Sequence, residues 1–480
     1  MRMRYFEFAW AVLLSGCTVG PDYVRPDLDL PKTFRFEERE ARDLANTAWW
    51  NQFRDPVLAE LIRIALVENK DLRIATARIE EFAGRFRSTR ADLFPQIGYS
   101  VSATGLRSSE VGPVPLTPGV DNPESVYDSL FTVTWELDVW GRIRRLSEAA
   151  RAELLASEEG RRGVILTLVS GVAGGYVNLR DLDKQLAISH RTVKTREEAL
   201  RLFERRFKGG VVSEVELAQV RSEYEAALAT IPQIETAIAQ NENALSVLLG
   251  RDPGPIRRAR SIDEMALPQV PAGLPSELLA RRPDLRQAEQ NLIAANARIG
   301  AARALYYPRI ALTTLLGFSS VELSDLFIGP AHTWQFAGSL VGPIFTAGAI
   351  EGTVEQAESQ QQQLLVAYER AIQNAFREVD DALIGHRKSR ERLASQARQI
   401  DALRHYARLA RLRFEGGYTS YLEVLDAERS LFNAELSHAQ TQNDVIQALI
   451  NTYKAMGGGW VTEADTLAGG PPRPMDVPQR

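Results

Sequence analysis

The chain has 480 residues, a charged fraction of 25% and a formal net charge of −5 at pH 7, a balance that does not favour nucleic-acid binding. Its single cysteine excludes a disulfide framework and a cysteine-based zinc site, and its five histidines show no metal-ligand spacing. The sequence holds no G-x-S-x-G, P-loop or H-E-x-x-H motif. We therefore expect no catalysis, no cofactor and no metal site.

The N-terminus predicts a secreted protein with a lipid anchor. Arg2 and Arg4 precede a short apolar run at residues 8–14, which is typical of a signal peptide. The following "LSGC" is similar to a bacterial lipobox, in which Cys17 is acylated and becomes the first mature residue. By analogy with bacterial lipoproteins, the absence of Asp directly after the cysteine, where this chain has Thr18, implies sorting to the outer membrane. A buried cysteine after an ordinary signal is the alternative. No stretch of 18 or more apolar residues follows to predict a transmembrane helix.

Strands are expected after a helix from about Pro56 to Leu93. In "QIGYSVSATG" and "FTVTWELDVW" every second residue is apolar, which predicts strands with one apolar and one polar face. Weaker alternation recurs over residues 310–318 and 334–344. Each run has about ten residues, the length of a membrane β-strand. A half-buried sheet in a soluble protein would show the same pattern, and that alternative stays open at this point.

Long gaps between prolines predict two pairs of long helices. The spans Gly141–Gly209 and Gly348–Gly416 each cover 68 positions, enough for a helix of roughly 100 Å. The return spans Gly210–Gly250 and Gly417–Gly457 each cover 40 positions, or roughly 60 Å. The chain is expected to reverse at "FKGG" and "FEGG", between each outward helix and its return.

The chain repeats itself. "RRFKGGVVSEVELAQV" and "LRFEGGYTSYLEVLDA" lie 207 residues apart, and "KDLRIATARI" and "PDLRQAEQNL" lie 213 apart. We expect repeats at 56–250 and 275–457, joined by an equatorial connection at 251–274. A signal peptide at 1–16, a lipid-anchored segment at 17–55 and a tail at 458–480 complete the organisation. Because the return helices are short, we expect residues 275–306 to continue the first return and residues 56–93 the second.

Four strands per chain cannot form a membrane barrel, which needs about eight, and lipid does not tolerate an open sheet edge. The chain is therefore expected to close its sheet with copies of itself by cyclic symmetry. Two copies would give eight strands and three would give twelve. The long helices that each strand pair carries favour the wider ring.

Several stretches together resemble the outer-membrane factor (TolC-like) family, in the lipoprotein branch that serves RND-type efflux pumps. They are "CTVGPDYVRP", "WWNQFRDPVLAELIRIALVENKDLRIATARI", "GLPSELLARRPDLRQAEQNLIAANARIGAARALYYPRIAL" and "YKAMGGGW". The resemblance implies a mainly α-helical homotrimer with a 12-stranded outer-membrane β-barrel continuing into a periplasmic helical tunnel. It also implies a passive conduit for small molecules, with a periplasmic adaptor (membrane fusion) protein and an inner-membrane RND transporter as partners.

The same resemblance assigns a tip and an aperture. The two glycine turns correspond to the periplasmic tip that contacts the adaptor, although a helix hairpin without a partner would need the same glycines. The tip residues are Phe207, Gly209, Gly210, Phe414, Gly416 and Gly417.

Glu423 and Asp426 correspond to the acidic periplasmic aperture and share one helical face. Three-fold symmetry would make them two cation-selective rings of carboxylates. The first repeat has Glu216 and Gln219 at the matching places, so only the second carries both acids. A solvated pair of carboxylates is the alternative.

Two other functions stay open. The first is the outer-membrane channel of a type I secretion system, although the lipobox and "GPDY" favour the efflux branch. The second is a pore-free, lipid-anchored periplasmic coiled-coil protein, which the alternating strands oppose.

Overall fold

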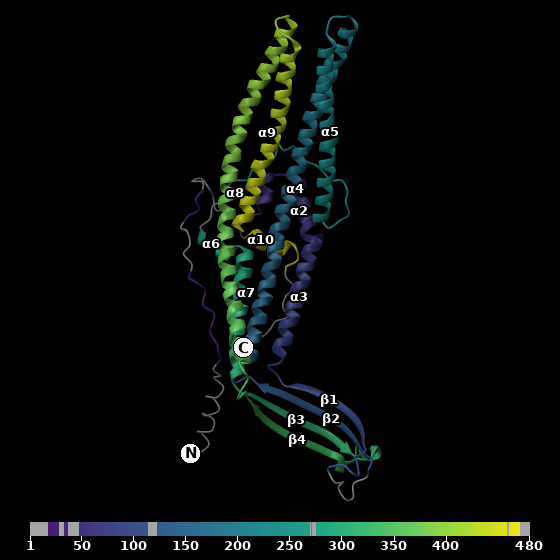
Figure 1. Ribbon diagram of the computed structural model, residues 1–480, viewed down its shortest axis with the longest axis vertical. Helices are drawn as coiled ribbons and strands as arrows, with labels where there is room; N and C mark the ends of the chain where they lie inside the picture. Colours follow the sequence, from purple (N-terminus) through teal and green to yellow (C-terminus); the bar gives the residue numbers. More distant parts are fainter. Residues whose placement is uncertain are drawn as a thin grey trace. The chain divides into compact units, whose positions relative to one another are not determined.

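The computed structural model describes residues 18–27, 33–36, 48–113, 122–268, 270, 275–457 and 460–470 (Figure 1). The predicted signal peptide and Cys17 lie outside the described residues. The helices are η1 (Trp49–Phe53), α2 (Pro56–Glu68), α3 (Lys70–Ala91), α4 (Arg142–Lys208), α5 (Glu214–Leu248), α6 (Pro275–Arg281), α7 (Pro283–Arg303), η2 (Ala304–Tyr306), η3 (Leu323–Asp325), η4 (Gly329–Ala331), α8 (Ala349–Glu415), α9 (Tyr421–Met456) and α10 (Trp460–Leu467). The strands are β1 (Gln96–Leu106), β2 (Glu124–Leu137), β3 (Arg309–Ser320) and β4 (His332–Val341).

The chain divides into two compact units. The sheet unit comprises residues 1–27, 80–156 and 288–368, and the helix unit comprises residues 28–79, 157–287 and 369–480. The divisions fall inside α3, α4, α7 and α8, so they do not follow the two repeats. Both outward helices have 67 residues, and the return helices have 35 and 36, which confirms the predicted lengths.

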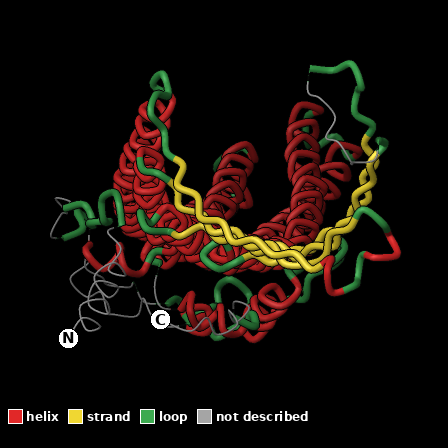
Figure 2. The backbone as a smooth tube through the Cα atoms, turned by 90° about the horizontal axis from the view of Figure 1, so that it is seen from below, coloured by secondary structure: helices red, strands yellow, loops and turns green. Residues whose placement is uncertain are grey.

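In the sheet unit, the four strands form one curved antiparallel sheet in the order β1-β2-β3-β4 (Figure 2). The register places Tyr99, Phe131, Leu316 and Trp334 in one row across all four strands. These four side chains are between 41% and 80% exposed. On the other face Asp128 accepts hydrogen bonds from Ser102 at 3.3 Å and Ser319 at 2.7 Å. The predicted alternation is thus confirmed, with an exposed apolar face and a polar face. Within the described residues, the outer edges of β1 and β4 pair with no further strand.

Two strand ends differ from the prediction. β2 ends at Leu137 because the Asp138 carboxylate accepts hydrogen bonds from the backbone N–H groups of Ile143 at 3.0 Å and Arg144 at 2.8 Å, which caps the start of α4. β4 ends at Val341, before residue 344, because the intervening Gly-Pro cannot continue the ladder.

In the helix unit, each predicted short helix is broken at a repeat-related position. Asn69 separates α2 from α3, and its side chain accepts a hydrogen bond from the backbone N–H of Leu72 at 2.9 Å. Arg282 separates α6 from α7, because the proline that follows it disfavours the helical conformation at Arg282. The expectation of single helices over 56–93 and 275–306 is therefore wrong.

The side chain at each break caps a return helix of its own repeat. Asn69 donates to the carbonyl of Leu248 at 2.9 Å, and Arg282 donates to the carbonyl of Ala455 at 3.0 Å. Carbonyls at a helix end lack intrahelical partners, so these contacts satisfy them. Thus α5 meets the α2–α3 break and α9 meets the α6–α7 break. The predicted exchange, in which each return helix would be continued by the other repeat, is wrong.

The glycines of α4 allow close packing of other helices. Asn241 of α5 donates to the carbonyl of Gly175 at 2.8 Å, and Gln447 of α9 donates to that of Gly174 at 2.7 Å. Glycine in a helix interior costs about 1 kcal/mol relative to alanine, and these contacts offset that cost. Of the described helices, α4 alone is long and apolar enough to cross a membrane, and 61% of its most apolar window is buried within the chain. We therefore interpret α4 as a core helix.

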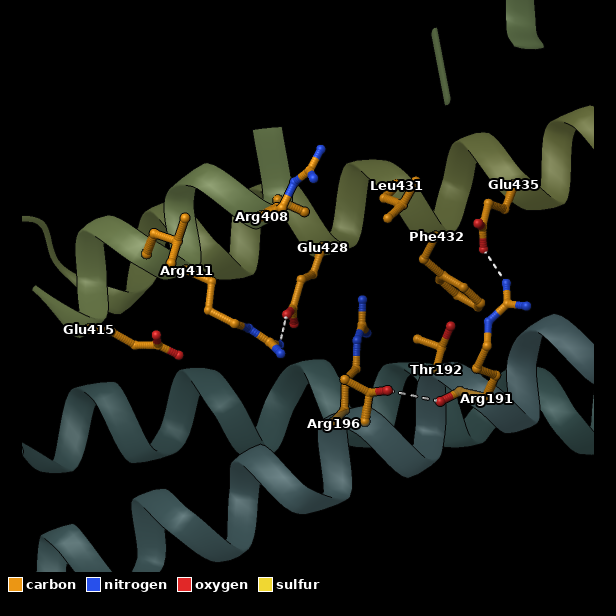
Figure 3. Close-up of a pocket in the computed structure, with 13 residues that line it drawn as sticks. Arg191, Thr192, Arg196, Arg408, Arg411, Glu415, Glu428, Leu431, Phe432 and Glu435 are labelled. Atoms are coloured by element: carbon orange, nitrogen blue, oxygen red, sulfur yellow. Dashed lines mark hydrogen bonds and ion pairs between the residues drawn. The ribbon is translucent and has the colours of Figure 1, made fainter. Parts of the chain in front are cut away.

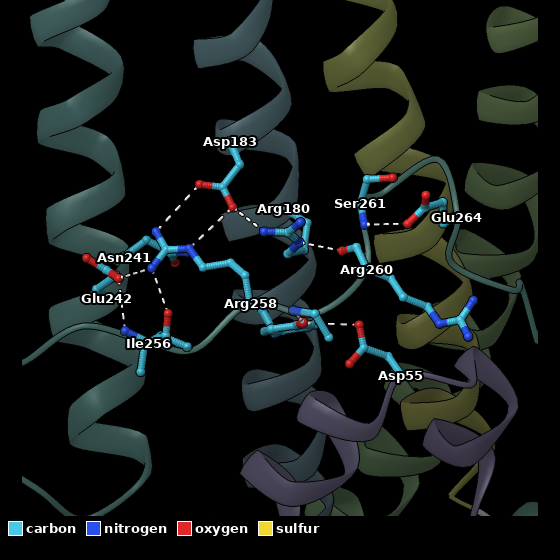
Figure 4. A network of polar contacts seen from close by, with 12 residues as sticks. Asp55, Arg180, Asp183, Asn241, Glu242, Ile256, Arg258, Arg260, Ser261 and Glu264 are labelled. Carbon is cyan, nitrogen blue, oxygen red and sulfur yellow. Dashed lines mark hydrogen bonds and ion pairs between the residues drawn. The ribbon is translucent and has the colours of Figure 1, made fainter.

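Polar contacts fix the connection after α5 onto the helices (Figure 4). The Arg258 guanidinium lies 3.3 Å from the Asp183 carboxylate on α4 and also pairs with Glu242 on α5. Arg180 donates to the carbonyl of Arg260 at 2.6 Å. Beside them, the Tyr176 hydroxyl donates to Asp55 at 3.0 Å. These contacts bind the connection to both α4 and α5.

Asp181 on α4 makes the stability of the helix unit sensitive to pH. It is buried, Gln185 donates to one carboxylate oxygen at 2.9 Å, and the other oxygen has no hydrogen-bond partner among the described residues. Burial raises the pKa of Asp181 from 3.8 to about 6. Because the folded state binds this proton more tightly than the unfolded state, the contribution of Asp181 to stability is fully present below pH 4 and is lost as pH rises through 6.

We expect Asp181→Asn to raise stability at pH 7.5, by on the order of 2 kcal/mol, and to flatten the slope between pH 4 and 7. Thermal unfolding followed by circular dichroism at a series of pH values measures both effects. Asp401→Asn, at an exposed acid of α8, is the control and should leave the slope unchanged. An unaltered slope in Asp181→Asn would contradict the assignment.

Candidate functional site

The helix unit contains two helical hairpins, α4–α5 and α8–α9, and both reverse through the same backbone turn. Gly210 and Gly417 have φ of +74° and +76°, a conformation that favours glycine. In each turn the following N–H, of Val211 or Tyr418, donates to a carbonyl five residues earlier at 2.9 Å or 2.8 Å. This hydrogen-bond pattern is the Schellman motif, which ends helices at a left-handed residue.

The other two predicted glycines have different roles. Neither Gly209 nor Gly416 has a positive φ. A side chain at Gly416 would lie 2.8 Å from the Tyr418 ring, whereas Gly209 has no contact that close. A side chain at 416 would therefore displace the exposed Tyr418 ring, and neither a positive φ nor such a contact applies at 209.

The two tip phenylalanines also differ, although the sequence treats them alike. Phe414 packs against Phe203 of α4 and Tyr421 of α9, with ring centroids 6.2 Å and 4.9 Å away. It therefore belongs to a core that joins the two hairpins. Phe207 is 40% exposed and lines a groove between α4 and α5 with Leu217. Of the two tip phenylalanines, Phe207 is the one exposed at the surface.

Glu423 lies in the first turn of α9 and is held by two side chains. Arg413 of α8 donates to one carboxylate oxygen at 2.9 Å, and the Thr419 hydroxyl donates to the other at 2.5 Å. The Glu423 side chain is 23% exposed. Its carboxylate is therefore fixed by the preceding turn.

Asp426 lies one turn further along α9 and lines the same groove as Glu423. Arg429 donates to Asp426 at 2.7 Å and lies 3.6 Å from Glu223 of α5. The groove has a volume of about 660 Å³ and includes Gln219, the repeat-related counterpart of Asp426. The structure thus brings the two predicted acids together, each paired with an arginine.

A third groove, of about 420 Å³, lies between α4, α8 and α9 (Figure 3). Arg191 pairs with Glu435 at 2.5 Å, and Arg411 pairs with Glu428. Arg196 is buried against the Phe432 ring, and burial lowers its pKa. The Arg191–Glu435 pair connects α4 to α9, whereas the Arg411–Glu428 pair joins α8 to α9 within the second hairpin.

Sequence reasoning missed the partners of the two acids. Arg413, Thr419 and Arg429 carry no motif of their own. The repeat offset of 207 offered one signal, because it pairs Thr419 with Val212, which has no hydroxyl. Among the described residues, no group of three or more His, Cys, Asp or Glu side chains could hold a metal ion.

Comparison with known proteins identifies the family of the chain. The family model described as outer membrane efflux protein matches residues 61–251 and 274–458. The chain belongs to this family. It is 37% identical over 459 residues to the toluene efflux pump outer membrane protein TtgC of Pseudomonas putida, covering 94% of each chain. It is 36% identical over 474 residues to the probable outer membrane lipoprotein SilC of Salmonella typhimurium, covering 96% of this chain and 99% of that one.

The fold agrees with this identification. The structure of the outer-membrane channel OprN superposes with a TM-score of 0.86 at 30% identity, covering 93% of this chain and all of that one. This outer membrane efflux protein is therefore a channel protein of the outer membrane, as the resemblance implied.

Proposed function

We propose that three copies of the chain close their sheets into one 12-stranded barrel, which opens into a tunnel of long helices and carries small molecules passively out of the periplasm. The observation that carries this proposal is the four-stranded sheet with an exposed apolar face and, within the part of the chain that the structure describes, two edges that pair with no further strand. Lipid accepts such a sheet only when its edges are paired. Three copies of a four-stranded sheet supply twelve strands.

The lipid anchor would sit beside the base of this barrel. Cys17 directly precedes a segment that is bound to the sheet unit, where the backbone N–H of Val19 donates to the carbonyl of Trp140 at 3.1 Å. Further along, Arg145 of α4 pairs with Asp22 at 2.7 Å, and Arg25 pairs with Glu289 of α7 at 2.5 Å. Acylation of Cys17 would thus hold the lipid close to the end of β2. The name of SilC as an outer membrane lipoprotein supports this assignment.

The tips and the groove acids have the roles that the family resemblance implies. Exposed apolar side chains at the tips, Phe207, Val211 and Tyr418, would contact a periplasmic adaptor that links the channel to an inner-membrane RND transporter. Glu423 and Asp426 would form the acidic aperture around the three-fold axis. No step of this transport needs catalysis or a cofactor. TtgC is named as part of an efflux pump, which favours efflux over type I secretion.

The test is single-channel conductance of the purified protein in planar bilayers, compared with Glu423→Ala/Asp426→Ala. We expect a small, cation-preferring conductance in the wild type, and a larger or less selective one in the variant, because rings of carboxylates favour cations. Glu391→Ala/Asp401→Ala removes two exposed charges of α8 and is the matched control. Unaltered conductance in the first variant would reject the aperture. Absence of conductance despite confirmed insertion would reject the open pore.

A further inference from the structure

The two repeats form the same turn but use its glutamate differently. Ser213 and Ser420 precede the return helices with nearly equal backbone angles, φ −78° and ψ 160° against φ −75° and ψ 159°. In the first repeat Glu216 accepts from the backbone N–H of Ser213 at 2.8 Å, and the Ser213 hydroxyl accepts from the N–H of Glu216 at 3.3 Å. This reciprocal pair is a capping box.

In the second repeat the capping box is absent although its residues are present. Ser420 makes no side-chain cap hydrogen bond. Glu423, the counterpart of Glu216, instead accepts from Arg413 and Thr419. The backbone is the same in both turns, so the difference must come from side chains.

The repeat-related residues explain the difference. The counterpart of Thr419 is Val212, which cannot donate a hydrogen bond. The counterpart of Arg413 is Arg206, whose guanidinium lies over aromatic rings, 5.6 Å from the Phe414 centroid and 6.0 Å from the Phe203 centroid. In the first repeat, therefore, neither residue competes with the capping box for Glu216.

We propose that Arg413 and Thr419 are positioning residues that withhold Glu423 from its capping box and place its carboxylate in the groove beside Asp426. The inference rests on the proposed aperture, which it deepens by naming the residues that set the place of its first ring of charge. In the second repeat the helix cap at Ser420 is lost and the Glu423 carboxylate lies in the groove instead. The first repeat keeps the cap and has no second acid.

The proposal predicts that removing Arg413 lowers the preference for cations, whereas the loss of a positive charge alone would raise it. Removing the positive charge of Arg413 would by itself make the aperture more negative and strengthen its preference for cations. If Arg413 positions Glu423, its removal lets the carboxylate move to the Ser420 N–H, and the preference for cations falls. Thr419→Val changes no charge and copies the first repeat, so its effect comes from position alone.

The experiment measures the reversal potential in a KCl gradient for the wild type, Thr419→Val, Arg413→Ala/Thr419→Val and Glu423→Ala. We expect the reversal potential to move toward zero in Thr419→Val and further in the double variant, approaching the value of Glu423→Ala. Arg206→Ala removes the repeat-related charge and is the control, which should keep the wild-type value. A double variant with wild-type or stronger cation preference would overturn the proposal.

A structure of the full-length double variant separates this inference from the aperture itself. We expect Glu423 to accept from the Ser420 N–H at a distance close to the 2.8 Å of the Glu216–Ser213 pair. If Glu423 moves there while Glu423→Ala leaves selectivity unchanged, the positioning stands and the aperture fails. If Glu423→Ala changes selectivity but the carboxylate stays out of the capping box, the positioning is overturned. Should the double variant not fold, Thr419→Val carries both measurements.

Discussion

Replacing Arg161 by methionine should destabilise the helix unit by about 3 kcal/mol, the lower end of the cost of breaking a buried ion pair, because the buried Asp465 then keeps only a more distant arginine. Arg161 lies on α4 and is 2% exposed, and it pairs with the buried Asp465 of α10. It also donates to the Thr76 hydroxyl at 3.0 Å and to the carbonyl of Ala468 at 3.2 Å. Its removal would leave Asp465 with Arg162, 3.5 Å away, as its remaining ion-pair partner.

Denaturant unfolding of the purified protein, followed by circular dichroism, measures the cost. Arg161→Met/Asp465→Leu is the matched variant, because a buried ion pair replaced by apolar groups of similar volume costs little or stabilises. We expect the double variant to regain most of the stability that the single variant loses. A double variant as unstable as Arg161→Met would show that the hydrogen bonds to Thr76 and Ala468, rather than the paired charge, hold α10 in place.

Features that depend on a periodic pattern or on the positions of proline and glycine could be predicted from the sequence. The 67-residue helices follow from the lack of proline and the glycines at both ends, and the faces of the sheet follow from strict alternation. The turns at Gly210 and Gly417 follow from the need for a positive φ. Each of these properties depends on neighbours along the chain, which a single sequence displays.

Features that depend on contacts between distant segments could not be predicted. The break at Asn69 depends on the end of α5, 179 residues later, whose carbonyl the Asn69 side chain caps. Both acids of the candidate aperture were found through the family resemblance, yet Arg413 and Arg429 were not, because nothing in the local pattern shows which arginine reaches a carboxylate. Phe207 and Phe414 show the same limit, since the shared R-F-x-G-G pattern places one at the surface and one in a core.

Gly250→Ala should cost about 3 kcal/mol or more, because it combines a left-handed backbone with a clash against another helix. Gly250 ends α5 with φ of +71°. A Cβ there would lie 2.1 Å from the carbonyl oxygen of Glu68 at the end of α2, and backbone atoms cannot move aside as a flexible side chain can. The change would therefore push apart the contact that joins the first return helix to the α2–α3 break.

Gly210→Ala separates the two causes. Gly210 has φ of +74°, nearly the same as Gly250, and no atom lies within 4 Å of the position its Cβ would take. Only the conformational cost applies there, about 1–2 kcal/mol. The difference between the two variants, measured by denaturant unfolding, is the contribution of close packing at the end of α5. Equal losses would mean that α2 can shift away from Gly250 at little cost, and that the hydrogen bond from Asn69 does not hold the two helices in register.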